Sequence, residues 1–321
     1  MKARYLAFFS YIGTPFRSSE KIWLKDNSKH IDPQSIQGVM ELALCKFKAL
    51  NYPQVTLSSR TDGGVHALNS SAHFDLDRYG TKLFEPHDIV FGLNKFFYTN
   101  DISINVRRCY RVADNFSARY NAIRRTYLYR LAVLKKGIEL PEYYGIGSEI
   151  PIEEWKRCHF IRLFDFDIER LKEGAKYLVG YHDFTTFKKF DKLKQYKHNR
   201  REIYDIIVRP GRPLLTSFVD DRDSFFDYWD IEIRGRAFVH NQIRRMMGTL
   251  ISVAVGKLPP EEIKVMLQVP SKHSWHNSIQ CSPPHGLYLC NVEYNPDDLI
   301  YAPERQSTHD TSLDEQESDS E

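Results

Sequence analysis

Ser58-Ser-Arg-Thr-Asp-Gly-Gly-Val-His-Ala-Leu68 organises this chain, because it sets one carboxylate, Asp62, in a turn between two β-rich segments. The paired glycines Gly63 and Gly64 let the backbone turn sharply and let a ligand approach closely. Arg60 lies two residues before Asp62. In extended chain, residues i and i+2 point to the same side, which brings Arg60 within reach of the Asp62 carboxylate. An Asp-Gly-Gly by itself is also typical of a hairpin turn with a surface ion pair.

The segments around this turn alternate between strand and helix in an order that occurs twice. The first 110 residues predict strand, helix, strand, strand, helix, strand, and the chain up to about residue 296 repeats this order with longer insertions. Two copies of βαββαβ predict an α+β protein with two ferredoxin-like halves. We expect their sheets, antiparallel and mixed, to join and leave a central cleft. The expected domains are 1–110 with the Asp62 loop, 111–296, and a disordered acidic tail, 297–321.

Individual elements follow from their apolar spacing. The helix expected over 33–50 has Asp32 as its N-cap and Pro33 at its first position. A long helix is expected over 239–255, and shorter ones over 86–97, over 168–179 and after Pro260. The expected strands cover 4–11, 54–59, 70–76, 102–106, 125–134, 202–208, 227–236 and 286–294.

Charge is unevenly distributed along the chain. The formal net charge is +3, but residues 302–321 hold seven acidic residues against Arg305, a net charge of −6, so the rest of the chain carries +9. A basic body suits a polyanionic partner.

The remaining composition excludes several classes of protein. Five dispersed cysteines favour reduced thiols in an intracellular protein over a disulfide framework or a zinc site. No cluster of His, Cys and acidic residues has the spacing of metal ligands, so no metal is expected. The apolar runs are too short to span a membrane. The strand-like run from Arg4 leads us to expect no secretory leader, and no organelle presequence is evident.

Arg60-Thr-Asp-Gly-Gly-Val-His66 closely resembles the active-site loop of the tRNA pseudouridine synthase A family, usually written Arg-Thr-Asp-Ala-Gly-Val-His. Segments 116–129, 181–187, 238–248 and 282–289 resemble further segments of the same family in the same order. The resemblance therefore spans about residues 4–294, and its variants look most like the animal tRNA pseudouridine synthase-like subgroup. It implies the pseudouridine synthase fold.

The resemblance also assigns roles to residues. Asp62 would be the catalytic carboxylate and Arg244 the active-site arginine, and Arg60 is the third predicted catalytic residue. The apolar neighbours of Arg244 predict a mostly buried helix, in which an arginine needs an anionic partner, and Asp62 is the obvious candidate. Tyr127 occupies the position of a base-stacking tyrosine, although an alternating strand alone would make it a core aromatic.

Three more residues complete the predicted substrate-binding set. Leu287 either lines the uracil pocket or belongs to the core, and Gly63 and His66 come from the Asp62 loop. Segment 181–187 is interpreted as scaffold. The basic segment 188–201 is either a solvated loop or an arm that contacts phosphates. One departure stands out, because the family's Trp-Gln after the first strand is missing from Tyr11-Ile-Gly-Thr-Pro-Phe-Arg-Ser-Ser19, so the RNA contacts of that loop are not carried over.

The resemblance implies an isomerase that converts uridine to pseudouridine in tRNA, messenger RNA or another structured RNA, with Asp62 as nucleophile and no cofactor. The sequence does not choose whether the carboxylate attacks the sugar, attacks the base or stabilises a detached base. Pairing with Arg60 or Arg244 would keep Asp62 ionised. Two alternatives are a catalytically silent RNA-binding relative and an N-glycosidase, although a hydrolytic glycosidase typically needs two carboxylates. A homodimer is a possible assembly, and the compartment, mitochondrial or cytoplasmic, is left open.

Overall fold

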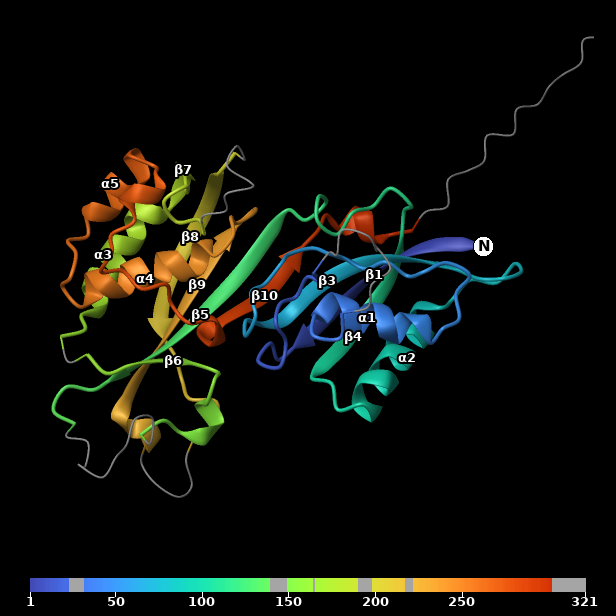
Figure 1. The fold of residues 1–321 in the computed structure, drawn as a ribbon, viewed down its shortest axis with the longest axis horizontal. Coiled ribbons are helices and arrows are strands. Elements are labelled where there is room, and N and C mark those ends of the chain that lie inside the picture. Colours follow the sequence, from blue (N-terminus) through green and yellow to red (C-terminus); the bar gives the residue numbers. More distant parts are fainter. Residues whose placement is uncertain (23–31, 139–148, 164, 190–197, 217–221, 302–321) are drawn as a thin grey trace, which may run out of the picture.

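The computed structural model describes residues 1–22, 32–138, 149–163, 165–189, 198–216 and 222–301. The tail from residue 302 onward and the centre of the basic segment therefore lie outside the described residues. The predicted start of the disordered tail, residues 297–301, is wrong, because Pro296–Leu299 form a 3-10 helix and the Tyr301 hydroxyl accepts a hydrogen bond from Arg111. Figure 1 shows two halves, one containing α1 and α2 and the other containing α3, α4 and α5, with β5 and β10 between them.

The N-terminal half has the predicted order of elements. Its strands are paired in the order β4-β1-β3, and β2 pairs with the edge of β3 that faces away from β1. This is the strand order of a ferredoxin-like unit. The elements are β1 (Lys2–Tyr11), α1 (Ile36–Cys45), β2 (Thr56–Leu57), β3 (His66–Asp77), α2 (Pro86–Thr99) and β4 (Ile104–Val112).

The C-terminal half repeats the arrangement with insertions. Its strands are paired in the order β10-β5-β9-β8, and β7 adds one further strand at the edge. The repeated elements are β5 (Arg124–Leu134), α3 (Ile168–Leu178), β8 (Arg200–Pro210), β9 (Phe226–Gly235), α4 (Gln242–Ala254) and β10 (Leu287–Glu293). The inserted ones are β6 (His159–Ile161), β7 (Gly180–Asp183) and α5 (Glu262–Gln268).

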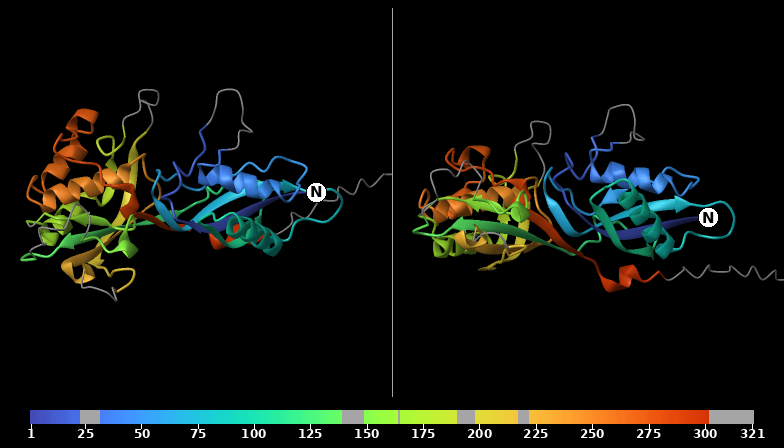
Figure 2. Two further views of the ribbon diagram at one scale, coloured as in Figure 1. Left: turned by 60° about the horizontal axis from the view of Figure 1, so that its bottom comes forward. Right: turned by 90° about the horizontal axis from the view of Figure 1, so that it is seen from below.

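The two halves share one ten-stranded sheet because β3 pairs with β10. This pairing is parallel and short, and it places Tyr288 opposite His66 and Leu289 opposite Ala67. In the further views the halves lie side by side with β10 passing between them (Figure 2). The predicted α+β class, the duplicated order and the joined sheets are confirmed. The junction brings the start of β3, which follows Asp62, next to the C-terminal half.

Two helix starts differ from the sequence prediction. The first helix begins at Ile36 and is capped by Ser35, whose side chain accepts from the Gly38 N–H. Asp32, predicted as the N-cap, instead accepts from the Gln34 N–H and pairs with Arg17. Its carboxylate therefore holds the turn before the helix, because short polar side chains compete for backbone N–H groups in turns.

The long helix begins at Gln242 rather than Val239. Asn241, just before it, has φ 62°, in the left-handed region. That conformation interrupts helical geometry, so residues 239–241 form a separate turn. This turn carries side chains of the candidate site.

The segment after β1, in which the family's Trp-Gln is missing, is anchored through a buried ion pair. Lys21 Nζ lies 2.8 Å from Glu41 on α1, and both side chains are almost fully buried. Glu41 also accepts from the Tyr52 hydroxyl and the Val55 N–H. The segment is thereby fixed against α1 on one side of the Asp62 loop.

We predict that Glu41→Gln destabilises the protein strongly, because it leaves the Lys21 ammonium buried without its counter-ion. Breaking a buried pair costs about 3–5 kcal/mol. The measurement is the denaturant midpoint of unfolding. Glu293→Gln, which breaks the more exposed Arg124–Glu293 pair, is the matched control and should cost less than about 1 kcal/mol. Equal losses in the two variants would contradict the prediction.

Candidate active site

Asp62 lies at the contact between the two halves and is surrounded by hydrogen-bond donors from the turn and first residues of α4. Arg244 donates from its terminal nitrogen to Oδ2 at 2.8 Å, and His240 Nε2 lies 3.3 Å from Oδ1. The orientation of the Asn241 amide that satisfies its hydrogen bonds places its nitrogen 3.1 and 2.9 Å from the two carboxylate oxygens. The predicted pairing of Arg244 with Asp62 is confirmed.

This environment favours the ionised carboxylate. Burial by itself raises the pKa of Asp62, but the hydrogen bonds and charges of His240 and Arg244 outweigh that effect and leave the pKa below its ordinary value. The side chain keeps 24% of its surface exposed. Asp62 is therefore charged at neutral pH and still accessible to a ligand.

Arg244 is itself held in place. Its Nε donates to the Ser282 carbonyl oxygen at 2.8 Å, and the Ser282 N–H donates back to the Arg244 carbonyl oxygen at 3.1 Å. Ser282 precedes β10, the strand that joins the halves. The same segment of chain that connects the sheets thus orients the arginine toward Asp62.

Arg60 does not pair with Asp62, contrary to the prediction. Its guanidinium lies 3.0 Å from Glu20, and both side chains are substantially exposed. The expectation assumed extended chain from Arg60 to Asp62, but the described strands end at Leu57 and resume at His66, so alternation of side chains does not apply between them.

The loop around Asp62 is supported by backbone contacts. A Cβ on Gly63 would lie 2.3 Å from the Arg17 carbonyl oxygen, so the close approach that Gly63 permits is by the protein's own chain rather than by a ligand. Gly64 has φ +81°. Ser19 accepts from the Thr61 N–H at 2.7 Å, and the Tyr11 hydroxyl is bonded to Thr61 at 2.8 Å.

Tyr127 comes from β5 and is nearly buried. Its ring packs edge-on against Phe238, 5.1 Å between centroids. Burial raises the pKa of Tyr127, and the negative charge of Asp62 adds to that rise, while a hydrogen bond to Ser59 opposes it. Tyr127 is therefore a neutral phenol at neutral pH, and the Asp62 carboxylate is one of the groups that keep it so. Its role as a base-stacking ring remains a prediction.

Arg125, two residues before Tyr127, forms hydrogen bonds with several separate segments around the site. Its guanidinium donates to the Ser59 hydroxyl at 2.6 Å and to the Ser58 carbonyl oxygen at 2.8 Å, and it also donates to the carbonyl oxygens of Arg236 and Arg119. One buried side chain thereby connects β5, the residues leading into the Asp62 loop, and the end of β9.

Two predicted substrate-binding residues lie in the interior. Leu287 is 5% exposed and belongs to the main hydrophobic core. His66 is fully buried and stacks on Tyr288. Its Nδ1 accepts from the Gly13 N–H, so its Nε2 donates to the Lys156 carbonyl oxygen. Burial lowers the pKa of His66 to about 4. His66 has no exposed atom to offer a substrate, so its predicted contact with substrate is wrong for this conformation and it serves as a structural link between the halves.

Other sequence expectations have mixed outcomes. Phe184 and Phe187 are fully buried and Tyr181 is exposed, so part of segment 181–187 belongs to the core, and its role as scaffold remains a prediction. The basic segment that follows starts beside the site, since the Lys189 N–H donates to the His240 carbonyl oxygen.

All five cysteines are free. In the part of the chain that the structure describes, no group of three metal-ligating side chains is found and no helix has the length and apolar character of a membrane span.

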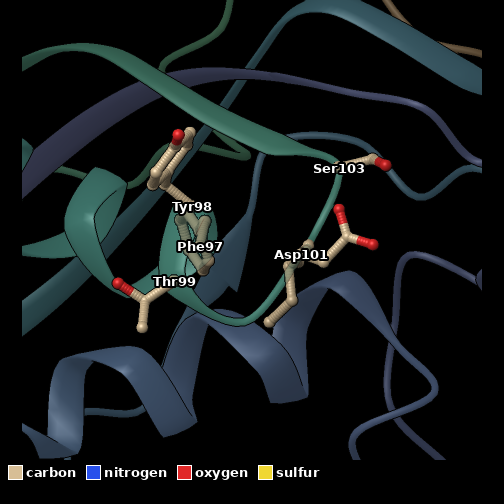
Figure 3. Close-up of a pocket in the computed structure, with 6 residues that line it drawn as sticks. Phe97, Tyr98, Thr99, Asp101 and Ser103 are labelled. Atoms are coloured by element: carbon tan, nitrogen blue, oxygen red, sulfur yellow. The ribbon is translucent and has the colours of Figure 1, made fainter.

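A separate hollow of about 590 Å³ lies at the end of α2 (Figure 3). Its labelled side chains, among them Tyr98, Asp101 and Ser103, do not converge on a common point. It contains none of the residues around Asp62, so it is not part of the candidate site.

Sequence reasoning missed three contributors to the site: His240, Asn241 and Arg125. All three lie inside segments that resemble the family, but their function depends on contacts with residues more than 60 positions away. The only signal in the sequence was the pair His240-Asn241 a few residues before Arg244, at the expected start of the long helix.

Comparison with known proteins identifies one family. The sequence model of the tRNA pseudouridine synthase family matches residues 175–295. The chain is 31% identical to tRNA pseudouridine synthase-like 1 of Xenopus laevis, over 93% of both chains. It is 31% identical to the Homo sapiens protein of that name, over 92% of this chain and 91% of the relative. Identity to tRNA pseudouridine synthase A of Dinoroseobacter shibae is 30%, over 92% and 97%.

The fold, the paired carboxylate and these relatives define an isomerase of the pseudouridine synthase class. The chain belongs to the tRNA pseudouridine synthase family.

We predict that His240→Ala moves the acid limb of the pH–rate profile to higher pH. The substitution removes a donor that lowers the Asp62 pKa, so Asp62 takes up a proton at a higher pH and the active carboxylate is lost earlier as the pH falls. The measurement is single-turnover rate against pH. His87→Ala, an exposed histidine on α2, is the control, and an unshifted limb in His240→Ala would refute the assignment.

Proposed function

We propose that this protein converts uridine to pseudouridine in RNA, with tRNA as the substrate class and Asp62 as the nucleophile. The observation that carries this proposal is the single ionised carboxylate of Asp62, partly exposed and oriented by Arg244, between the two halves. The relatives named as tRNA pseudouridine synthases support the substrate class.

The reaction exchanges one glycosidic bond for another. The N1–C1′ bond breaks, the released uracil turns, and C5 bonds to C1′. C5 then loses its proton and N1 gains one, so the product is an isomer of the substrate. As the nucleophile, an Asp62 oxygen bonds to C1′ while N1 leaves with the electron pair of the broken bond, and C5 then displaces that oxygen from C1′, which restores the free carboxylate. No oxidant, reductant or added group is needed.

The surroundings of Asp62 favour isomerisation over hydrolysis. A hydrolytic glycosidase typically uses two carboxylates, one of which activates water or protonates the leaving group. Among the described residues, the side chains that contact Asp62 are Arg244, His240 and Asn241, and none of them is a second carboxylate. A single nucleophilic carboxylate without a partner to activate water suits isomerisation, in which the uracil stays bound until C5 has bonded to C1′.

The target nucleotide has to leave its stack to reach Asp62. Extruding a base costs a few kcal/mol, and the basic body of the chain offsets this through phosphate contacts. Arg60, held at the surface by Glu20, is free to exchange that carboxylate for an RNA group. The carboxylate at Asp62 stays paired with Arg244 and needs no rearrangement before attack.

We predict that Asp62→Asn abolishes tritium release from RNA labelled at C5 of uridine, because the amide is not a nucleophile. RNA affinity should stay within several-fold of wild type, since the amide preserves the shape of the side chain. Normal release by this variant would refute the mechanism. Abasic sites in the RNA treated with wild type would identify a glycosidase, and binding without release by wild type would identify a silent relative.

We also predict that Tyr127→Ala and Arg244→Ala lower the single-turnover rate by about 100-fold or more, as expected for groups that stabilise charge or position the base at the reacting centre. Lys188→Ala, in the segment beside the site, should change the rate only a few-fold. The measurement is tritium release at saturating RNA. Equal damage in all three variants would contradict the site assignment.

A further inference from the structure

Three arginines meet beside the Asp62 loop. The buried guanidinium of Arg125 donates to the carbonyl oxygens of both Arg119, at 3.0 Å, and Arg236. Arg119 and Arg236 are exposed, whereas Arg125 keeps 6% of its surface. Because one planar group contacts both backbones, the residues that carry the other two positive charges are fixed next to it.

This cluster has no acidic partner within the described chain. None of the ion pairs there involves Arg119, Arg125 or Arg236, and every acceptor of Arg125 is a neutral oxygen. Burial lowers the pKa of Arg125, and the positive charges of Arg119 and Arg236 lower it further, although Tyr127 and Tyr294 oppose this. Arg130, buried to a similar degree, is paired with Glu154.

Concentrated positive charge without a counter-ion destabilises the free protein and favours an anion. An acidic side chain would be the usual solution if the cluster were purely structural. The cluster is therefore suited to receive its negative charge from a ligand.

One exposed aromatic ring borders the cluster. Tyr120 is 78% exposed, and the Arg119 guanidinium lies 5.8 Å from the centre of its ring. Ile123 is 50% exposed on the same connection. Positive charge next to an exposed aromatic ring is the combination that holds single-stranded nucleic acid, with phosphates on the charges and a base on the ring.

The cluster also has a defined position relative to the chemistry. Arg125 holds Ser58 and Ser59, which lead into the Asp62 loop, and it lies two residues from Tyr127 in β5. A phosphate on the cluster would belong to a nucleotide close to the one that reaches Asp62.

We propose that Arg119, Arg236 and Tyr120, positioned by the buried Arg125, form a subsite that binds the RNA backbone next to the target uridine, with phosphate on the Arg119 and Arg236 guanidinium groups and a neighbouring base on the Tyr120 ring. This inference rests on the proposed function, because it takes RNA as the ligand.

The test is the salt dependence of RNA binding by the full chain carrying Arg119→Gln and Arg236→Gln together. The probe is a pool of fluorescently labelled, unmodified tRNA transcripts, and Kd is measured by anisotropy over a series of potassium chloride concentrations. Losing two phosphate contacts should lower the slope of log Kd against log salt by about 2. In tritium release, KM should rise while kcat at saturating RNA stays near wild type.

Matched variants distinguish loss of the subsite from a general loss of positive charge on the protein. Arg107→Gln removes the same charge from an exposed position on β4, at the far end of the sheet, and should leave the slope almost unchanged. Tyr120→Ala should weaken binding about 10-fold without changing the slope, because stacking contributes about 1–3 kcal/mol per base and releases no counter-ions. Thermal unfolding of each variant confirms that these surface changes leave the fold intact.

The outcomes separate this subsite from the proposed function. An unchanged slope and KM in the double variant, with tritium release intact, would overturn the subsite and leave the function standing. A slope change equal to that of Arg107→Gln would also overturn it. If wild type releases no tritium, the proposed function fails, whereas the slope comparison still decides whether these arginines contact RNA phosphate.

Discussion

The ion pair between Asp62 and Arg244 is the interaction on which the site depends, because it joins residues from the two halves of the sheet. A partly buried carboxylate is unfavourable unless donors surround it. Arg244, His240 and Asn241 supply those donors, all from the turn and first residues of α4. The pair also requires that β3 and β10 lie side by side, since these strands set the distance between the halves.

Around this pair, hydrogen bonds from side chains to backbone groups hold the loop in position. Arg125 fixes the residues that lead into the Asp62 loop, and Ser19 holds the Thr61 N–H from the other side. Asn241 adopts a left-handed conformation, which is costly for a residue with a side chain. Its amide contacts with Asp62 give a reason for that strain, because a regular helix starting earlier would aim the side chain elsewhere.

The arrangement suits a reaction in which charge has to be ready before the substrate arrives. Asp62 is ionised and fixed, so little reorganisation is needed at the moment of attack. The segment after β1 lacks the family's Trp-Gln, yet residues 11–21 still support the Asp62 loop through Tyr11, Ser19 and the Arg17 carbonyl oxygen. This segment therefore keeps a structural role, while the inferred contacts with the RNA backbone come from residues just before β5 and just after β9.

The sequence by itself determined the duplicated order of strands and helices, the position of Asp62 in a turn, and the need of a buried Arg244 for an anion, because these follow from periodicity, glycine geometry and the cost of burying charge. Only the tertiary structure decided which donors reach Asp62. His240 and Asn241 reach Asp62 through a left-handed turn before α4. Arg60 pairs with Glu20 because the chain between Arg60 and Asp62 is not a strand. His66 is buried at the junction because β3 pairs with β10 there. Contacts between residues far apart in the chain depend on strand register and loop shape, which local pattern does not encode.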